Sequence, residues 1–117
     1  METTEDDLSP RSLQKGSAEF LVLACLDGRD RHGYELARLI ETRSGSRLSF
    51  PAATLYPLLY KLEKRGLVHG RWVEKPGERR RRFYHLTPAG RLALGSQRKA
   101  WNEFMEAIRL VGRLGPA

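Results

Sequence analysis

Residues 67–88 read LVHGRWVEKPGERRRRFYHLTP, and the period of the pattern changes here from helical spacing to an alternation of two. Alternation is typical of β-strands, and Pro76-Gly77-Glu78 is typical of a hairpin loop. The stretch therefore predicts two short strands, 67–75 and 79–87, joined by that loop.

Helical periodicity lies on both sides of this hairpin. Upstream, three helices are predicted: from Ser9-Pro10 to Gly28, over 31–43 after an Asp30 cap, and within 51–65. Downstream, Thr87-Pro88 is a cap followed by proline, which predicts a helix to about Gly112. Three helices, a hairpin and a final helix predict a winged helix-turn-helix, mainly α with a small β-hairpin (α+β).

Three parts are expected along the chain. Residues 1–8 begin with METTEDD, acidic and without a basic residue, and are expected to form a flexible acidic tail. Residues 9–87 are expected to form the winged helix-turn-helix DNA-binding domain, and 88–117 the C-terminal dimerisation helix. In such a fold the third helix enters the major groove and the hairpin reaches the adjacent backbone or minor groove.

The third helix has two unlike faces. Steps of 100° per residue place four leucines on one face: Leu55, Leu58, Leu59 and Leu62. Pro57 is unfavourable inside a helix, so the regular helix is expected to begin close to Thr54 or to bend there.

The charge predicts an acidic partner. The 117 residues include 21 Lys+Arg and 14 Asp+Glu, for a net charge of +7, and the pI is about 10.1. A basic domain of this size favours nucleic acid or an anionic membrane surface as its partner. Cys25 is the only cysteine, and the apolar run 20–26 is too short to span a bilayer. We therefore expect a cytoplasmic protein without a membrane partner.

Several short motifs occur in a characteristic order. They are His32-Gly33-Tyr34-Glu35-Leu36, Thr54-Leu55-Tyr56-Pro57, Leu59, Leu62-Glu63, Gly66-Leu67-Val68, Trp72, Arg81-Arg82-Phe83-Tyr84-His85-Leu86-Thr87 and Gly90. Over about residues 14–111 this order resembles the PadR family of bacterial transcription regulators. The resemblance implies a homodimeric winged-helix repressor whose dimer interface is built by the last and first helices. It also implies a small aromatic or lipophilic effector, and control of transporters, detoxification enzymes or the protein's own operon. The METTEDD stretch is no part of the family pattern.

Two sets of residues are candidates for DNA contact. On the third helix they lie opposite the leucines: Thr54, Tyr56, Tyr60, Lys61 and Lys64. On the wing, which is the predicted hairpin of residues 67–87, and on the second helix they are Lys75, Arg79, Arg80, Arg81, Arg82 and Tyr34. Alternation along the strand would place Arg80 and Arg82 on one face with Tyr84, and Arg79 and Arg81 on the other. The alternatives are core packing for Tyr34 and Tyr56, and an ordinary solvated charge run for the arginines.

The last helix carries an apolar stripe, formed by Trp101, Phe104, Met105, Ile108 and Val111. It predicts a dimer interface, because the stripe would otherwise remain exposed. Trp101 would either pack in that interface or line a pocket for a flat aromatic ligand between the two copies.

No enzyme site is predicted. The sequence shows no nucleophile–base set and no phosphate-binding glycine loop, and His32, His69 and His85 are not at metal-ligand spacing. We expect no catalytic residue, no metal and no cofactor. The remaining alternative to DNA recognition is a basic module that binds proteins or anionic surfaces.

Overall fold

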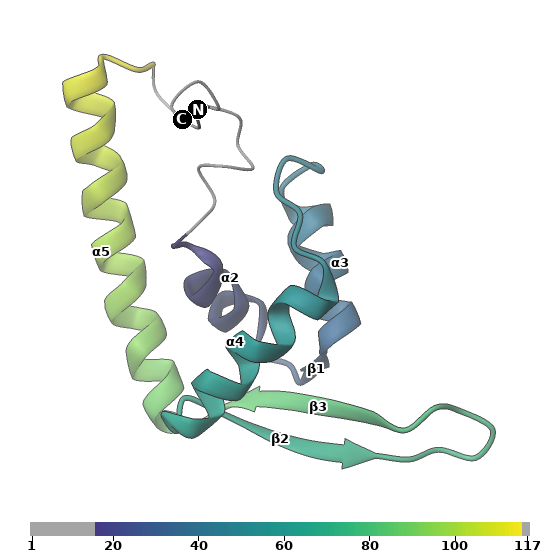
Figure 1. The fold of residues 1–117 in the computed structure, drawn as a ribbon. Helices are drawn as coiled ribbons and strands as arrows, with labels where there is room; N and C mark the ends of the chain where they lie inside the picture. Colours follow the sequence, from purple (N-terminus) through teal and green to yellow (C-terminus); the bar gives the residue numbers. More distant parts are fainter. Residues whose placement is uncertain (1–15, 116–117) are drawn as a thin grey trace, which may run out of the picture.

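The computed structural model describes residues 16–115 (Figure 1). Its elements in chain order are α2 (Ala18–Cys25), β1 (Arg31–His32), α3 (Gly33–Arg43), α4 (Ala52–Lys64), β2 (Val68–Val73), β3 (Arg81–Leu86) and α5 (Pro88–Gly112). The strands form an antiparallel sheet in the order β1-β3-β2. The predicted fold class, a mainly α winged helix-turn-helix, is confirmed. The expected acidic tail and the helix start at Ser9-Pro10 lie outside the described residues.

The sequence prediction missed β1. This two-residue strand pairs with β3, Arg31 opposite Tyr84 and His32 opposite Phe83, and the rings of His32 and Phe83 meet edge to face. Two residues are too short to show a period, so only tertiary pairing reveals the strand. β2 and β3 are themselves shorter than predicted at the loop end, where residues 74–80 form the tip of the wing.

The predicted start of α3 was wrong in one detail. Asp30 does not cap the helix; His32 does, in a reciprocal capping box with Glu35. The Glu35 N–H donates to His32 Nδ1 at 3.3 Å, and the His32 N–H donates to Glu35 Oε1 at 3.1 Å. Pairing of β1 with β3 moves the helix start to Gly33, and Asp30 instead binds Arg71 at 3.2 Å.

Two other helix boundaries differ from the prediction. α2 ends at Cys25, and Gly28 lies beyond it in the following turn with φ +87°. α4 begins at Ala52, before Thr54, and contains Pro57. Proline has no N–H for the carbonyl of Ala53, so the helix loses one backbone hydrogen bond there. Burial of the leucines that follow holds the helix together despite that loss.

One apolar core joins all the helices to the sheet. Its fully buried side chains include Val22, Leu23, Leu36, Leu55, Leu59, Leu62, Val68 and Leu94. Three of the four leucines predicted on one face of α4 are buried, and Leu58 packs partly buried against the same cluster. Burial of this face therefore fixes the rotation of α4 about its axis, and the opposite face remains exposed to solvent.

The turn after α4 anchors the start of α5. Gly66 has a φ of +77°, and the Leu67 N–H donates to the carbonyl of Leu62 at 3.0 Å, which closes a Schellman motif. Thr87 caps α5 as predicted, accepting from the Gly90 N–H at 3.0 Å. A Cβ at Gly90 would collide with the carbonyl oxygen of Leu67. The close contact at Gly90 thus fixes where the long helix leaves the domain.

Alanine at Gly90 and alanine at Gly95 are expected to change stability in opposite directions. Both residues lie in α5, but a Cβ at Gly95 would meet nothing within 4 Å. Gly95→Ala should raise the free energy of unfolding by about 0.5–1 kcal/mol, because alanine is the better helix former. Gly90→Ala should lower it by about 1–3 kcal/mol, as overpacking does. Urea unfolding at equal protein concentration measures both, and equal changes would contradict the contact at Leu67.

Candidate nucleic-acid interface

α4 presents a polar face outward. The predicted residues Thr54, Tyr56, Tyr60, Lys61 and Lys64 are all exposed along it. The Lys64 ammonium lies 5.2 Å from the ring centre of Tyr60, whose side chain is 62% exposed. Hydroxyl and ammonium groups on one outer helix face can donate to phosphates and base edges.

Tyr56 and Tyr34 flank the start of α3. Tyr56 is 42% exposed, yet its ring also rests on Gly33, where a Cβ would lie 2.8 Å from Tyr56 Cε1. Gly33 therefore allows α3 and α4 to approach closely. Tyr34 is 53% exposed in the first turn of α3 and is not part of the buried core. Both phenols are accessible to a ligand on this side.

The wing separates its four arginines. Arg79 and Arg80 lie in the tip, and Arg81 and Arg82 lie in β3 opposite Val73 and Trp72. Lys75, Arg79 and Arg80 are exposed. The guanidinium of Arg80 stacks 4.5 Å from the ring centre of Trp72, which also receives Arg82 at 5.6 Å. Arg80 and Arg82 thus share a side of the wing, as the alternation predicted.

Arg82 is bound to α4. Its Nη2 donates to both carboxylate oxygens of Glu63, at 2.8 and 3.0 Å, and only 29% of its side chain is exposed. Partial burial alone would raise the pKa of Glu63, but the hydrogen bonds from Arg82 and the Gly70 N–H outweigh it and lower the pKa. Glu63 is therefore ionised at neutral pH, and the positive charge of Arg82 is already paired with this carboxylate.

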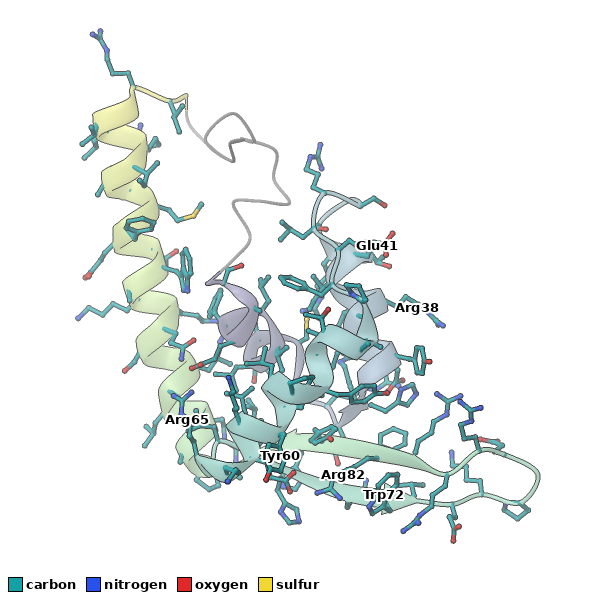
Figure 2. All side chains as sticks on the ribbon, in the orientation of Figure 1. Arg38, Glu41, Tyr60, Arg65, Trp72 and Arg82 are labelled. Carbon is teal, nitrogen blue, oxygen red and sulfur yellow. The ribbon has the colours of Figure 1, made fainter. Side chains whose placement is uncertain are left out.

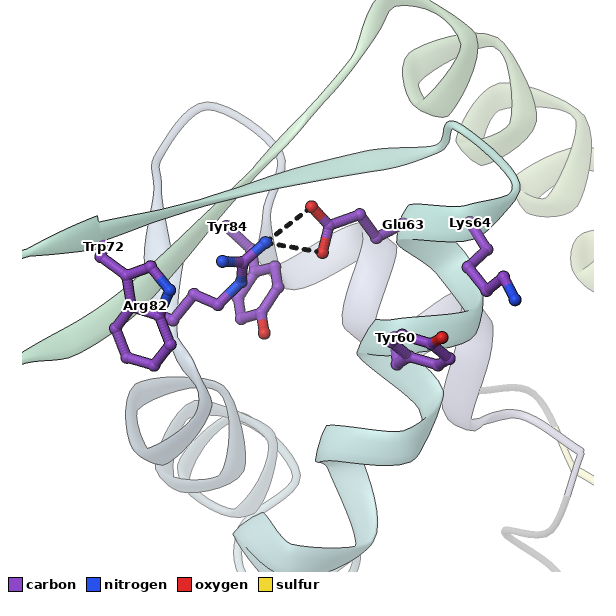
Figure 3. Close-up of a pocket in the computed structure, with 6 residues that line it drawn as sticks. All are labelled: Tyr60, Glu63, Lys64, Trp72, Arg82 and Tyr84. Atoms are coloured by element: carbon purple, nitrogen blue, oxygen red, sulfur yellow. Dashed lines mark hydrogen bonds and ion pairs between the residues drawn. The ribbon is translucent and has the colours of Figure 1, made fainter.

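A groove lies between α4 and the wing (Figure 3). It has a volume of about 540 Å³ and is lined by Tyr60, Glu63, Lys64, Trp72, Arg82 and Tyr84. Figure 2 shows Tyr60, Arg82 and Trp72 beside one another along this edge of the molecule. Burial raises the pKa of the Tyr84 phenol, so that side chain is neutral. Its aromatic rings and the exposed Lys64 ammonium can contact the bases and phosphates of a nucleic acid.

Comparison with known proteins identifies the family. The family model described as "Transcriptional regulator PadR-like family" matches residues 22–96, which include α3, α4 and the whole wing. The chain belongs to the PadR-like family. Its members are DNA-binding transcription regulators and not enzymes.

The chain is also similar to individual proteins and solved structures. The transcriptional regulator Rv3488 of Mycobacterium tuberculosis is 35% identical over 98 residues, which cover 84% of this chain and 88% of that protein. The structure of smu.1704 from Streptococcus mutans is 34% identical, with a TM-score of 0.69, and the match covers 86% of this chain and 91% of that one. PadR of Bacillus subtilis, solved in complex with operator DNA, has a TM-score of 0.62 at 23% identity, covering 68% of this chain and 45% of that one.

α5 of this PadR-like chain extends away from the other helices (Figure 1). Its predicted stripe is largely uncovered: Phe104, Met105, Ile108 and Val111 are 47–86% exposed. Trp101 is half-buried, with its ring centre 6.1 Å from that of Phe20 in α2 and 5.9 Å from that of Phe104. The stripe therefore begins on the packed core and continues beyond it as an open apolar surface.

A second carboxylate connects the helices of the PadR-like fold. Glu19 in α2 accepts from Arg65, directly after α4, and from Gln97 in α5, both at 2.8 Å. The hydrogen bond from Arg65 lowers the pKa of Glu19, and although partial burial opposes it, the bond from Gln97 adds to the lowering. The position of α5 is thereby connected to the end of α4.

Residues 16–115 contain neither a candidate metal site nor a candidate membrane-spanning helix. No group of three or more His, Cys, Asp or Glu side chains there could hold a metal ion. No described helix is long and apolar enough to cross a membrane. His32 is the cap of α3, and His69 faces His85 across the wing.

Sequence reasoning did not find the groove. It treated Arg82 as part of the charge at the wing tip, and it assigned no role to Glu63 or Trp72. One signal was present, because alternation places Gly70 and Trp72 on the same face as Tyr84 and Arg82 once the register of the hairpin is known. The predicted strands 67–75 and 79–87 imply this same register, because a loop centred on Gly77 pairs Trp72 with Arg82. Alternation does not tell which helix lies against that side of the hairpin.

Loss of the Glu19 carboxylate is expected to reduce the acid sensitivity of the fold. Because the pKa of Glu19 is lowered in the folded state, its stabilising effect is present above the ordinary value of 4.5. That effect is lost as the pH falls through the folded pKa. Glu19→Gln should therefore unfold at lower urea than wild type at pH 7, with a smaller difference at pH 3.

Glu103→Gln is the matched control, because Glu103 is an exposed carboxylate of α5. It should retain the wild-type dependence of the urea midpoint on pH. The role of Glu19 would be contradicted by a constant difference between Glu19→Gln and wild type at pH 7 and pH 3.

Proposed function

We propose that the chain is a homodimeric transcriptional repressor that binds a palindromic operator. In this proposal the two α4 helices enter successive major grooves, about 34–36 Å apart, and the wings contact the flanking backbone. The observation that carries it is the exposed polar face of α4 with a basic wing beside it. Residues 9–87 would act as the DNA-binding domain, 88–117 as the dimerisation helix, and the site of action would be the bacterial cytoplasm.

Different residues would have different roles on the DNA. Thr54, Tyr56 and Tyr60 have hydroxyls that can donate to base edges and phosphates, so they would contribute to sequence recognition. Lys61, Lys64, Lys75, Arg79, Arg80 and Arg81 would supply charge to the backbone, with Tyr34 contacting a phosphate from α3. Arg82, which binds Glu63, would act mainly by holding the wing. The solved complex of Bacillus subtilis PadR with operator DNA supports a DNA partner for this fold.

The dimer would form through the stripe on α5. Phe104, Met105, Ile108 and Val111 offer an apolar surface that a single copy leaves exposed, and the half-buried Trp101 lies at its start. A second copy covers it with the same surface in a two-fold arrangement. A small aromatic or lipophilic effector entering beside Trp101 would change the separation of the α4 helices, provided that it binds the two separations with different affinities.

Removing the two lysines of α4 is expected to weaken DNA binding without changing its sequence preference. Lys61→Ala with Lys64→Ala should make the slope of log affinity against log salt shallower by about 3.6, because the dimer loses four phosphate contacts and each contributes about 0.9. A salt series on random duplex DNA and on the chain's own upstream region measures both quantities. Lys99→Ala, an exposed lysine of α5, should leave the slope at the wild-type value.

The same measurement separates DNA recognition from general binding to anionic surfaces. A repressor should prefer one upstream sequence over random duplex DNA and should lose affinity steeply with salt. Equal affinity for all duplexes and for vesicles of anionic lipid would favour the alternative, a basic surface-binding module.

A charge in the α5 stripe is expected to dissociate the dimer. Ile108→Glu would bury an unpaired carboxylate, which should raise the dimer dissociation constant by about 100-fold or more. Leu92→Glu is the matched control, since Leu92 is also exposed but lies on the opposite side of the same helix by 100° steps. Analytical ultracentrifugation over a dilution series distinguishes them. A dimer that survives Ile108→Glu but not Leu92→Glu would place the interface elsewhere.

A further inference from the structure

One carboxylate connects the last turn of α4 to both long strands of the wing. Glu63 Oε2 accepts from Arg82 Nη2 of β3 at 2.8 Å and from the Gly70 N–H of β2 at 3.2 Å. Its Oε1 accepts from the same Arg82 nitrogen at 3.0 Å. Charge-assisted hydrogen bonds of this kind are shorter and stronger than neutral ones.

Gly70 provides the space for this contact. Gly70 lies opposite Tyr84, two pairs before Trp72 and Arg82, and is therefore on the same side of the hairpin as they are. A Cβ at Gly70 would come within 2.5 Å of Arg82 Nε and 2.9 Å of its Cζ. A side chain at position 70 would therefore force the guanidinium to shift from the path by which it crosses β2 and reaches α4.

Beyond this contact the wing separates from α4. The groove between them is walled by Tyr60 and Lys64 on α4 and by Trp72 on the wing, and Glu63 and Arg82 bridge it (Figure 3). Within residues 16–115, Glu63 makes the hydrogen bonds between α4 and the hairpin that lie nearest the tip. The ring of Trp72 contacts the guanidinium groups of both Arg82 and Arg80, so Arg80, one of the two exposed arginines of the tip, is placed relative to the same bridge.

We propose that Glu63 is a positioning residue for DNA binding, which holds Arg82 over Gly70 and so fixes the wing at the angle to α4 that lets both contact one duplex. This proposal rests on the proposed function. For removal of the Glu63 carboxylate, this proposal predicts a change in DNA affinity opposite to the change that charge alone predicts. A carboxylate beside a phosphate-binding surface repels DNA, and its removal would by itself tighten binding and steepen the salt dependence. A positioning role requires the opposite result.

The test compares Glu63→Gln with Glu74→Gln in the full chain, on the upstream duplex and on random duplex DNA. Glu74 is an exposed residue directly after β2, so each variant removes one negative charge, Glu63→Gln from α4 and Glu74→Gln from the wing. Glu74→Gln should bind DNA as tightly as wild type or more tightly. Glu63→Gln should bind about tenfold more weakly, with a shallower salt slope because the wing no longer contributes its phosphate contacts.

Gly70→Ala provides a second variant that changes no charge. It should displace Arg82 and reproduce the weaker binding and the shallower slope. All affinities are measured at a temperature where circular dichroism shows each variant to be folded. If Glu63→Gln does not fold, the comparison of Gly70→Ala with wild type decides.

Each outcome bears on the proposal. Tighter binding by Glu63→Gln, as for Glu74→Gln, would overturn the positioning role and leave DNA binding intact. Weaker binding by Glu63→Gln with the wild-type salt slope would also overturn the positioning role, because Glu63 would then contribute only to stability. If wild type itself binds no duplex at low salt, the proposed function and the positioning role fail together.

Discussion

The burial of Leu55, Leu59 and Leu62 is the constraint on which the candidate DNA surface depends. These three side chains are fully buried, and they fix the rotation of α4 about its own axis. Once one face of a helix is held in a core, the residues on the other face must point outward. The exposure of Thr54, Tyr60 and Lys64 is therefore a consequence of the hydrophobic core. The same burial keeps the helix intact through Pro57, which lacks a backbone donor.

Polar contacts then place the neighbouring elements relative to this helix. Glu63 at its last turn binds the wing, and Arg65 directly after it binds Glu19, which also accepts from Gln97 of α5. The wing and the α5 helix are thus connected to opposite sides of the same short segment. A change in the separation of two α5 helices in a dimer would act on α4 through this segment. This arrangement gives the proposed repressor a physical route from its dimer interface to its DNA surface.

The sequence predicted the order of elements well, because long periodic segments and strong caps are local signals. The leucine face of α4, the Thr87 cap and the apolar stripe of α5 each follow from spacing or residue type within a few positions. The sequence did not predict features that depend on pairing between residues far apart in the chain. β1 exists only because β3 lies beside it, and that pairing made His32 the cap of α3 in place of Asp30. The link between Glu63 and Arg82 was missed for the same reason, since it joins residues nineteen positions apart across a gap left by Gly70. The candidate surface on α4 was predictable, whereas the groove beside it required the fold.

In the proposed complex, α4 lies in the major groove while the wing lies on the backbone next to it. Methylation protection at guanine N7, which lies in the major groove, tests this claim directly on a fragment selected by the chain from its source genome. We expect two protected clusters of guanines centred about one helical turn apart, with hydroxyl-radical protection of the backbone at their flanks. Tyr60→Ala should restore methylation within the clusters, and Arg80→Ala should restore cleavage only at the flanks. Protection confined to the minor groove, or unaffected by the change at Tyr60, would show that α4 does not lie in the major groove.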